Sequence, residues 1–390
     1  MVMVTPGRGT LDPDRRLLLS RAKLAGLVRS HWGVDAFDGN ARPAMSGLVA
    51  RRGERGWMLV EEDAGRALGR ALLWALRSGV RDLHLLFPAD DEAAVPAARR
   101  GRLFRTQVAV WRVQGTDLSP VAAEPLPREP ALDARAEPYR ELLTAAGAEP
   151  VVEWGTLYGD VWGLEVARVE QARPAAGQGP PPLGGGRVEV PAGAAEPPVE
   201  LDDDLWLGVG VTKEDRLTHH LVWGGEPGVD AVRSVVDQVR EIRERADLAH
   251  PLNQVARERW LRAWLLLEAA QVGAAGLQPV SPPVPRADDV RLRAPAAALG
   301  SAQDGQAVLV VCSVGFDSEA VPMAVELAEA ATAGAGDATR LVVAMPARDD
   351  HPLLRLAMDD AVLPVELAAV PDDWPERCRA LSRSGGASTG

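Results

Sequence analysis

The stretch AVLVVCSVGFDSEAVPMAVELAEA (residues 307–330) decides the fold class of this chain. Its first six residues are all apolar, which predicts a buried strand, and a turn with Gly315 and Asp317 leads into a helical pattern. The alternation continues with RLVVAMP (340–346), HPLLRLAMDDA (351–361) and PVELAAV (364–370). Buried apolar strands that alternate with helices are typical of a largely parallel sheet covered on both faces.

The N-terminal part has the same mixture of patterns. Leucines near helical spacing predict a helix over 15–30, and two short strands, Ala44–Arg51 and Trp57–Glu61, are joined by the turn sequence RRGERG. A second helix over 64–79 follows, and then come the strands DLHLLF (82–87) and TQVAVWRV (106–113). This order again indicates a compact α/β domain.

Two sequence echoes link the halves of the chain. LHLLFPADD (83–91) recurs as LVVAMPARDD (341–350), and SGLVARR (46–52) resembles WGLEVARV (162–169). Both echoes keep the same order. We therefore expect two tandem, duplicated, three-layer α/β domains with mixed or largely parallel sheets. The alternative is chance recurrence of a strand, a Pro-Ala turn and a helix.

Composition shifts suggest the domain boundaries. Residues 115–138 are rich in proline and predict an extended linker between a domain over 1–114 and a larger one over 139–380. Residues 171–204 are richer still in proline and glycine, and they predict a disordered insertion within the larger domain. The stretch 381–390 predicts a disordered tail.

Overall composition limits the class of protein. The chain has 390 residues, of which 46% are hydrophobic and 25% charged, as in globular proteins. Its net charge of -12 argues against a generic polyanion-coating protein. Cys312 and Cys378 lack metal-ligand spacing, and the sequence has neither a signal-peptide pattern nor an apolar run of membrane-spanning length. We expect a cytoplasmic protein without a membrane segment.

The order of elements in each half, a helix, a strand hairpin, a third strand, a helix and another strand, resembles the core of the PD-(D/E)XK nucleases. In the C-terminal half, the first arm of the hairpin is VVEWGTLYG (151–159) and the second is VWGLEVARVE (161–170), with a predicted turn at 158–160. The third strand is DLWLGVGVT (204–212). The resemblance implies catalytic roles for Asp160, Glu165 and Lys213. It also implies Mg²⁺ or Mn²⁺ bound by Asp160, Glu165 and Glu214, because carboxylate oxygens suit hard divalent cations.

The sequence departs from the family pattern near the lysine. Val211 stands two residues before Lys213, where the family has a carboxylate, and Glu214 and Asp215 follow the lysine instead. The N-terminal half offers carboxylates without a lysine, so that copy is expected to be inactive. The alternative for all these charges is that they solvate loops and cap helices.

The turn after the strand at 307–312 is a second candidate site. Ser313, Gly315, Asp317 and Ser318 follow a predicted parallel strand and precede a helix, which is where open α/β sheets bind ligands. Neither of the glycine-rich phosphate-binding motifs is present. Helix capping by Asp317 or Ser318 is the alternative interpretation.

Arginine clusters form the third candidate. Nearly all basic residues are arginines, since the chain has only two lysines, and the densest cluster includes Arg99, Arg100 and Arg102. Arg257 and Arg259, next to Trp260, could contact phosphates and stack on a base. The alternative is a salt-bridged helix face with Trp260 and Trp264 in the core.

These observations lead to one functional hypothesis and two alternatives. The first is a nucleic-acid-processing protein with a nuclease-like, metal-dependent C-terminal domain and DNA as partner. The second is a non-catalytic interaction or scaffold protein with degenerate nuclease-like domains, which would bind a protein partner or form a homo-oligomer. The third is a small-ligand-binding α/β protein that uses the turn at 313–318.

Overall fold

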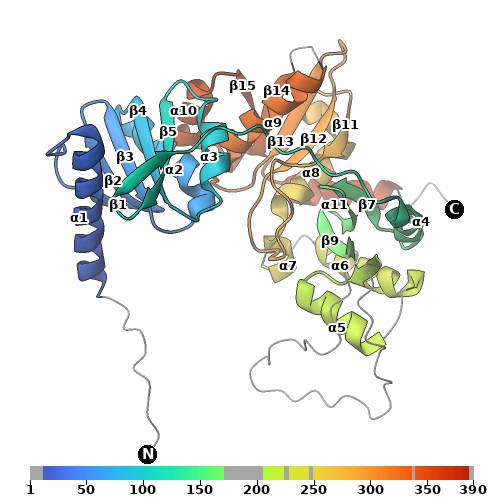
Figure 1. Ribbon diagram of the computed structural model, residues 1–390. Coiled ribbons are helices and arrows are strands. Elements are labelled where there is room, and N and C mark those ends of the chain that lie inside the picture. The colour runs from blue at the N-terminus through green and yellow to red at the C-terminus, as the bar shows by residue number, and fades with distance from the viewer. Residues whose placement is uncertain (1–11, 171–204, 224–227, 246–248, 336–338, 386–390) are drawn as a thin grey trace, which may run out of the picture. The chain divides into compact units, whose positions relative to one another are not determined.

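The computed structural model describes residues 12–170, 205–223, 228–245, 249–335 and 339–385 (Figure 1). Helices are combined with three mixed or antiparallel sheets, so the predicted α/β class is confirmed. The predicted insertion at 171–204 lies outside the described residues. Within the described part, no helix is long and apolar enough to span a membrane.

The chain forms two compact units. The first unit takes in Met1–Leu126, Ser318–Ala330 and His351–Val365, and the second takes in Pro127–Asp317, Ala331–Asp350 and Glu366–Gly390. The first unit therefore includes two segments from the C-terminal part of the chain, whereas the prediction of domains over 1–114 and 139–380 places both segments in the larger domain.

The first unit is built on a six-stranded sheet in sequence order. Its strands are β1 (Arg42–Ala44), β2 (Gly47–Arg52), β3 (Arg55–Val60), β4 (Asp82–Pro88), β5 (Gln107–Gln114) and β6 (Asp117–Pro120). β1 to β3 are antiparallel, β3, β4 and β5 are parallel, and β6 returns antiparallel to β5. Because β6 pairs in this sheet, the predicted linker at 115–138 begins within the first unit.

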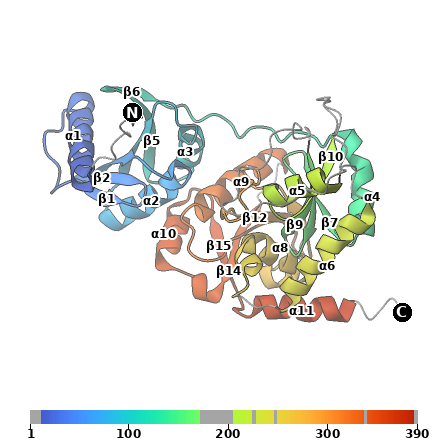
Figure 2. The same cartoon turned by 90° about the horizontal axis from the view of Figure 1, so that it is seen from below.

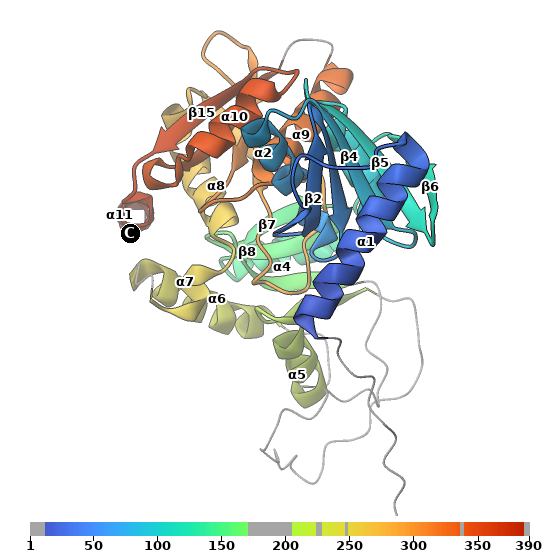
Figure 3. The ribbon, with the colours of Figure 1, turned by 90° about the vertical axis from the view of Figure 1, so that its left-hand side faces the viewer.

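Helices cover both faces of this sheet. α1 (Pro13–Trp32) lies on one face, while α2 (Ala67–Ser78) and α3 (Ala94–Gly101) lie on the other (Figures 2 and 3). The apolar side of α1 buries Leu24, Leu27 and Val28 against Trp57 and Leu59 of β3. Burial of this apolar area from water is the main stabilising contribution here.

The second unit contains a four-stranded antiparallel sheet. Its order is β10 (Trp206–Val209), β9 (Leu164–Glu170), β8 (Thr156–Val161) and β7 (Glu149–Glu153). α4 (Glu137–Ala145) and α6 (Val229–Arg245) pack on it, with Leu143, Val232 and Val236 buried against strand residues such as Val166. α5 (Lys213–Trp223) follows β10 directly.

Two Trp-Gly dipeptides make the turns of this sheet. Trp154 and Gly155 have φ of 52° and 69°, and Trp162 and Gly163 have φ of 48° and 73°. Positive φ at both central residues is the geometry of the type I′ hairpin turn, which matches the twist of the strands. The predicted turn at 158–160 is therefore wrong, because Tyr158 and Asp160 lie within β8.

A second sheet completes this unit. Its order is β11 (Gly276–Val280), β12 (Ala296–Ser301), β13 (Ala307–Cys312), β14 (Arg340–Pro346) and β15 (Val365–Val370). β11, β12 and β13 are antiparallel, and β13 and β14 are parallel. α7 (Pro251–Gln254) precedes α8 (Arg257–Leu267), and α11 (Trp374–Gly385) ends the chain's last described segment. Trp260 and Trp264 of α8 are buried beside Trp374 of α11. The prediction that these two tryptophans belong to the core is therefore confirmed.

The same order of elements occurs twice. The first series consists of α1, the antiparallel strands β1 to β3, α2, β4, α3 and β5. The second series consists of α8, the antiparallel strands β11 to β13, α9 (Ala320–Ala335), β14, α10 (Pro352–Asp360) and β15. LHLLFPADD and LVVAMPARDD occupy the equivalent strands β4 and β14. SGLVARR and WGLEVARV do not correspond, since the second lies in β9 of the antiparallel sheet.

The C-terminal end differs from the prediction. α11 continues to Gly385, so residues 381–385 of the predicted disordered tail are helical, and the rest of that tail lies outside the described residues. Trp374 is fully buried, and its burial holds this last helix to the unit.

Candidate functional site

The structure brings Asp160 and Glu165 together. They are register partners on β8 and β9, and each residue is only 2% exposed. Paired residues on neighbouring antiparallel strands point to the same face of a sheet. Two of the predicted catalytic residues therefore share one face, as the nuclease resemblance requires.

The Asp160 carboxylate is bound by an arginine that the sequence did not single out. Arg286 donates two hydrogen bonds to Asp160, at 2.7 and 2.9 Å, and a third from Nε to Glu153 at 2.6 Å. Arg262 of α8 donates to the other oxygen of Glu153 at 2.7 Å. The Arg286 guanidinium also lies 4.0 Å from the centre of the Tyr158 ring. This is a fully buried bidentate pair with additional partners.

Glu165 is held by two further arginines. Arg168 Nε and Arg216 Nη1 both donate to Glu165 Oε1, at 3.0 and 2.9 Å. Arg216, from α5, is 1% exposed, and its Nε also donates to Glu170 at 2.9 Å. Glu153, Asp160 and Glu165 thus form, with Arg168, Arg216, Arg262 and Arg286, one buried network that we call the carboxylate–arginine network.

Electrostatics favour the ionised form of Glu153. Burial alone would raise the pKa of Glu153, but the positive charges of Arg286 and Arg262 outweigh it and hold that pKa well below its usual range. Burial likewise would lower the pKa of Arg286, and Asp160 and Glu153 hold it well above its usual value. Glu153 and Arg286 therefore hold each other in their charged forms as a buried ion pair.

Lys213 does not join the two carboxylates. It is the first residue of α5 rather than a residue next to a strand end, and its side chain is 58% exposed. Its Nζ lies 3.5 Å from Asp288, which accepts a hydrogen bond from Arg168 at 2.7 Å. The lysine reaches Glu165 only through these intervening side chains.

The acids after Lys213 belong to the start of α5. Glu214 is exposed. Asp215 accepts a hydrogen bond from the Thr212 N–H at 3.0 Å and donates its own N–H to Thr212 Oγ1 at 3.1 Å. This reciprocal pair is a capping box, so the helix-cap alternative is confirmed for Asp215.

The residues proposed to bind Mg²⁺ or Mn²⁺ do not fit a metal. Among the residues that the structure describes, no group of three or more His, Cys, Asp or Glu side chains is arranged to hold one. A cation at Asp160 would have to displace Arg286, which would then remain buried without its partner.

The predicted arginine cluster lies in the first unit, and its members form ion pairs with carboxylates. It consists of Arg99, Arg100 and Arg102. Arg99 and Arg100 are 5% and 3% exposed, and the Nε of each donates to Glu326. Arg102 makes a bidentate pair with Glu329 at 2.5 and 2.6 Å. These guanidinium groups have carboxylate partners and do not present an open phosphate-binding face.

The turn after β13 is buried rather than open. Ser313, Asp317 and Ser318 are at most 5% exposed. Gly315 has a φ of 76° and donates its N–H to Asp349 at 2.7 Å, so the turn is tied to the segment after β14. The positive φ explains why the position needs glycine, and a Cβ there would also lie 2.7 Å from Arg293 Nη1.

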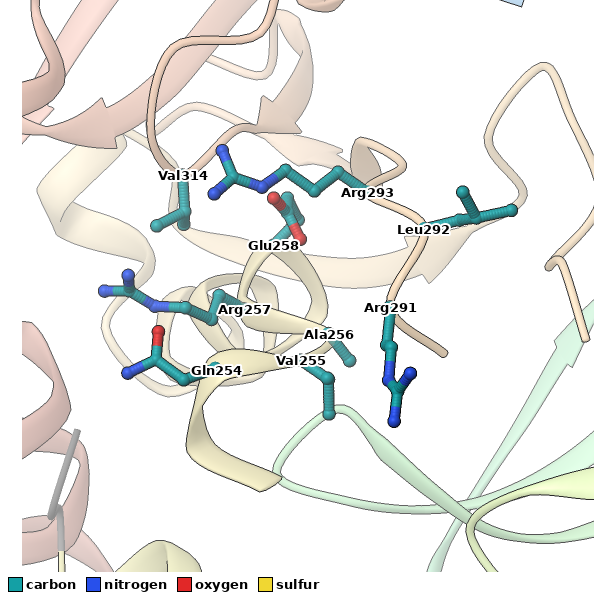
Figure 4. A pocket seen from close by; sticks show the side chains of 9 residues that line it. All are labelled: Gln254, Val255, Ala256, Arg257, Glu258, Arg291, Leu292, Arg293 and Val314. Carbon is teal, nitrogen blue, oxygen red and sulfur yellow. The ribbon is translucent and has the colours of Figure 1, made fainter. Parts of the chain in front are cut away.

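A small pocket lies beside this turn (Figure 4). Its volume is about 30 Å³, and it is lined by Gln254, Val255, Ala256, Arg257, Glu258, Arg291, Leu292, Arg293 and Val314. Its residues come from the end of α7 and the start of α8, from the segment between β11 and β12, and from the turn after β13. Arg257, which was predicted as a nucleic-acid contact, lines this pocket. Arg259, which was predicted with it, donates a hydrogen bond to the carbonyl of Gly163 at 3.1 Å.

Sequence reasoning missed Arg286 and Arg293. Both lie between β11 and β12, in a proline-rich and arginine-rich segment without apolar periodicity. In a chain whose basic residues are almost all arginines, these two have no distinguishing signal.

Comparisons with known proteins do not add to this geometry. No protein-family model matches the chain, and we found no similar curated protein or solved structure.

Proposed function

We propose that the protein is a non-catalytic binding protein, in which the carboxylates predicted to be catalytic are structural. One observation carries the proposal. The carboxylates of Asp160 and Glu165 are buried and bonded to Arg286, Arg168 and Arg216, so their charge is already neutralised by the chain itself. Catalytic carboxylates need a free oxygen for a metal, water or substrate.

The recurring element order supports the same proposal. The nuclease-like order of a helix, three antiparallel strands, a helix and a strand occurs at α1 to β4 and at α8 to β14. The second and third strands of both series, β2 and β3 or β12 and β13, contain no carboxylate and no lysine. We propose that the two series are copies of one ancestral layout and that neither copy keeps a catalytic motif.

Charge supports a partner other than nucleic acid. The chain carries a net charge of -12, and the arginines Arg99, Arg100 and Arg102 are neutralised by Glu326 and Glu329. A protein that coats phosphate backbones needs exposed positive charge. A protein partner or a small ligand therefore fits this chain better than DNA.

Cleavage of single- and double-stranded DNA in the presence of Mg²⁺ or Mn²⁺ tests the proposal. We expect no cleavage above the level of a Glu165→Gln preparation purified in the same way. Metal-dependent cleavage by the wild type that is lost in Glu165→Gln would overturn the proposal and favour the nuclease.

The nuclease alternative retains one favourable observation. Asp160 and Glu165 are register partners and share Arg286, which lies 2.7 Å from Asp160 and 3.9 Å from Glu165. Titration of the full chain with Mn²⁺, followed calorimetrically, separates the two functions. Binding of Mn²⁺ that is lost in Asp160→Asn favours the nuclease, and absence of binding favours the non-catalytic protein.

A further inference from the structure

The pocket of Figure 4 contains arginine donors without acceptors. The Nε and Nη2 atoms of Arg257 are buried and, among the described residues, have no hydrogen-bond partner. Buried donors in proteins are nearly always paired with protein or with water, so two unpaired guanidinium nitrogens beside a pocket are able to hold an external acceptor. Such an acceptor comes from outside the described part of the chain.

The surroundings of Arg257 include two further arginines, which contribute positive potential. Arg293 and Arg348 both lie close enough to repel the charge of Arg257, and burial and this repulsion lower its pKa. Asp349 and Glu258 oppose the repulsion. Figure 4 shows the guanidinium groups of Arg257 and Arg293 on the same side of the pocket, near Val314, whereas Arg291 points away.

The backbone adds to this positive potential. Arg257 is the first residue of α8, an 11-residue helix, and Ala256 before it has no side chain that could cap the free N–H groups. The N-terminus of a helix carries a partial positive charge and attracts anions. The helix, Arg257 and Arg293 thus favour the same kind of ligand.

Glu258 is the one carboxylate that lines the pocket. It is 5% exposed, and burial, together with the nearby Asp317, raises its pKa, while Arg293 and Arg259 oppose the increase. The negative charge of the ionised form opposes an incoming anion, so neutralising Glu258 is expected to favour binding. The lining therefore carries three arginines and one carboxylate.

We propose that this pocket binds a tetrahedral oxyanion, a phosphate or sulfate group, with Arg257 as its main ligand and Arg293 as the second. A tetrahedral oxyanion presents acceptor oxygens in several directions, so it can accept hydrogen bonds from guanidinium groups on separate segments of the chain. The volume of about 30 Å³ suits one small group, equivalent to about two water molecules, so the remainder of a larger ligand lies outside. This site is separate from the carboxylate–arginine network and does not depend on the proposed function.

Isothermal titration of the full chain with sodium sulfate and with inorganic phosphate, at an ionic strength held constant with chloride, tests the site. We expect both anions to bind with one-to-one stoichiometry. We expect Arg257→Gln to weaken binding at least about tenfold, since each hydrogen bond to a charged group contributes substantially. Arg293→Gln is expected to weaken it less.

Two further variants keep the test decisive. Arg233→Gln, at an exposed arginine of α6 that pairs with Asp230, is the matched control and should bind sulfate as the wild type does. Glu258→Gln keeps the shape of the side chain and should tighten binding severalfold, a gain that misfolding cannot produce.

The results that contradict the proposal are equally specific. The site does not exist if sulfate and phosphate bind no better than chloride, or if Arg257→Gln binds them as the wild type does. Acetate that binds as tightly as sulfate would overturn the tetrahedral class. A short DNA duplex that competes with sulfate in the wild type, but does not bind Arg257→Gln, would support the site and assign its phosphate to nucleic acid.

Discussion

The second unit contains two groups of arginines in contrasting environments. In the carboxylate–arginine network, Arg286 donates three hydrogen bonds to Asp160 and Glu153. In the pocket, Arg257 has two buried nitrogen atoms without an acceptor among the described residues. Both groups lie beside acids, and both are rich in arginine.

The contrast shows which buried charges indicate function. A buried ion pair that is fully hydrogen-bonded is a structural feature, and its removal mainly affects stability. Arg216 Nη2 of the network also lacks a hydrogen-bond partner in the described part of the chain, but it lies 4.0 Å from the Asp288 carboxylate. The unpaired nitrogens of Arg257 lie beside a pocket instead, so they indicate a ligand more directly.

Loss of Arg286 should give the largest effect. Arg286→Met leaves Asp160 and Glu153 buried without their main partner, and we expect the free energy of unfolding to fall by about 3–5 kcal/mol. Urea unfolding followed by circular dichroism measures the change. Arg233→Gln should cost less than about 0.5 kcal/mol, because its ion pair is exposed. Equal losses of unfolding free energy in both variants would mean that Arg286 contributes no more to stability than an exposed ion pair does.

The second largest effect should be a loss of stability at acidic pH, which weakens the carboxylate–arginine network. The pKa of Glu153 is lower in the folded chain than its ordinary value of 4.5, so its contribution to stability is complete above that pH and is lost as the pH falls below it. We expect the urea midpoint of the wild type to decrease more between pH 6 and pH 3.5 than that of Glu153→Gln. Parallel pH profiles would refute a stabilising ionised Glu153.

The same substitution at Arg257 should have little effect on stability. Arg257→Met removes a guanidinium with unpaired nitrogen atoms, and we expect the free energy of unfolding in the absence of sulfate to change by less than about 1 kcal/mol. In the presence of sulfate, only the wild type should gain stability, since a ligand that binds the folded state stabilises it. A loss as large as that of Arg286→Met would remove the contrast between the two regions.

The smallest expected effect is the pH dependence of sulfate binding. Glu258 faces Arg257, Arg293, Arg259 and Asp317, and its raised pKa means that it becomes neutral at a less acidic pH than an ordinary glutamate. We expect sulfate, whose own charge stays constant, to bind a few times more tightly at about pH 4.5 than at about pH 7.5. Glu258→Gln should flatten this profile, and an unchanged profile would exclude Glu258 as its cause.

The fold followed well from local patterns. The apolar run at 307–312 and its alternation with helices predicted β13, β14, α10 and β15, because buried strands and helices differ in periodicity and length. The errors occurred at turns and ends. The turn at 158–160 was misplaced because the paired Trp-Gly dipeptides were not recognised as hairpin turns.

The candidate site was only partly predictable. Asp160, Glu165 and Arg257 were selected for their residue types, but their partners Arg286 and Arg216 lie more than 50 positions from the carboxylates they bind. Whether a carboxylate is open or neutralised depends on such distant partners. Residue type and spacing along the chain contain no information about them.

The sequence by itself determined the α/β class and the alternation of strands and helices after residue 307, because backbone conformation responds to local periodicity and turn chemistry. Only the tertiary structure decided that Asp160 and Glu165 are neutralised while Arg257 retains unpaired donors. The physical reason is that the electrostatic free energy of a charge depends on every group within a few ångströms. Folding, rather than local sequence, selects those groups.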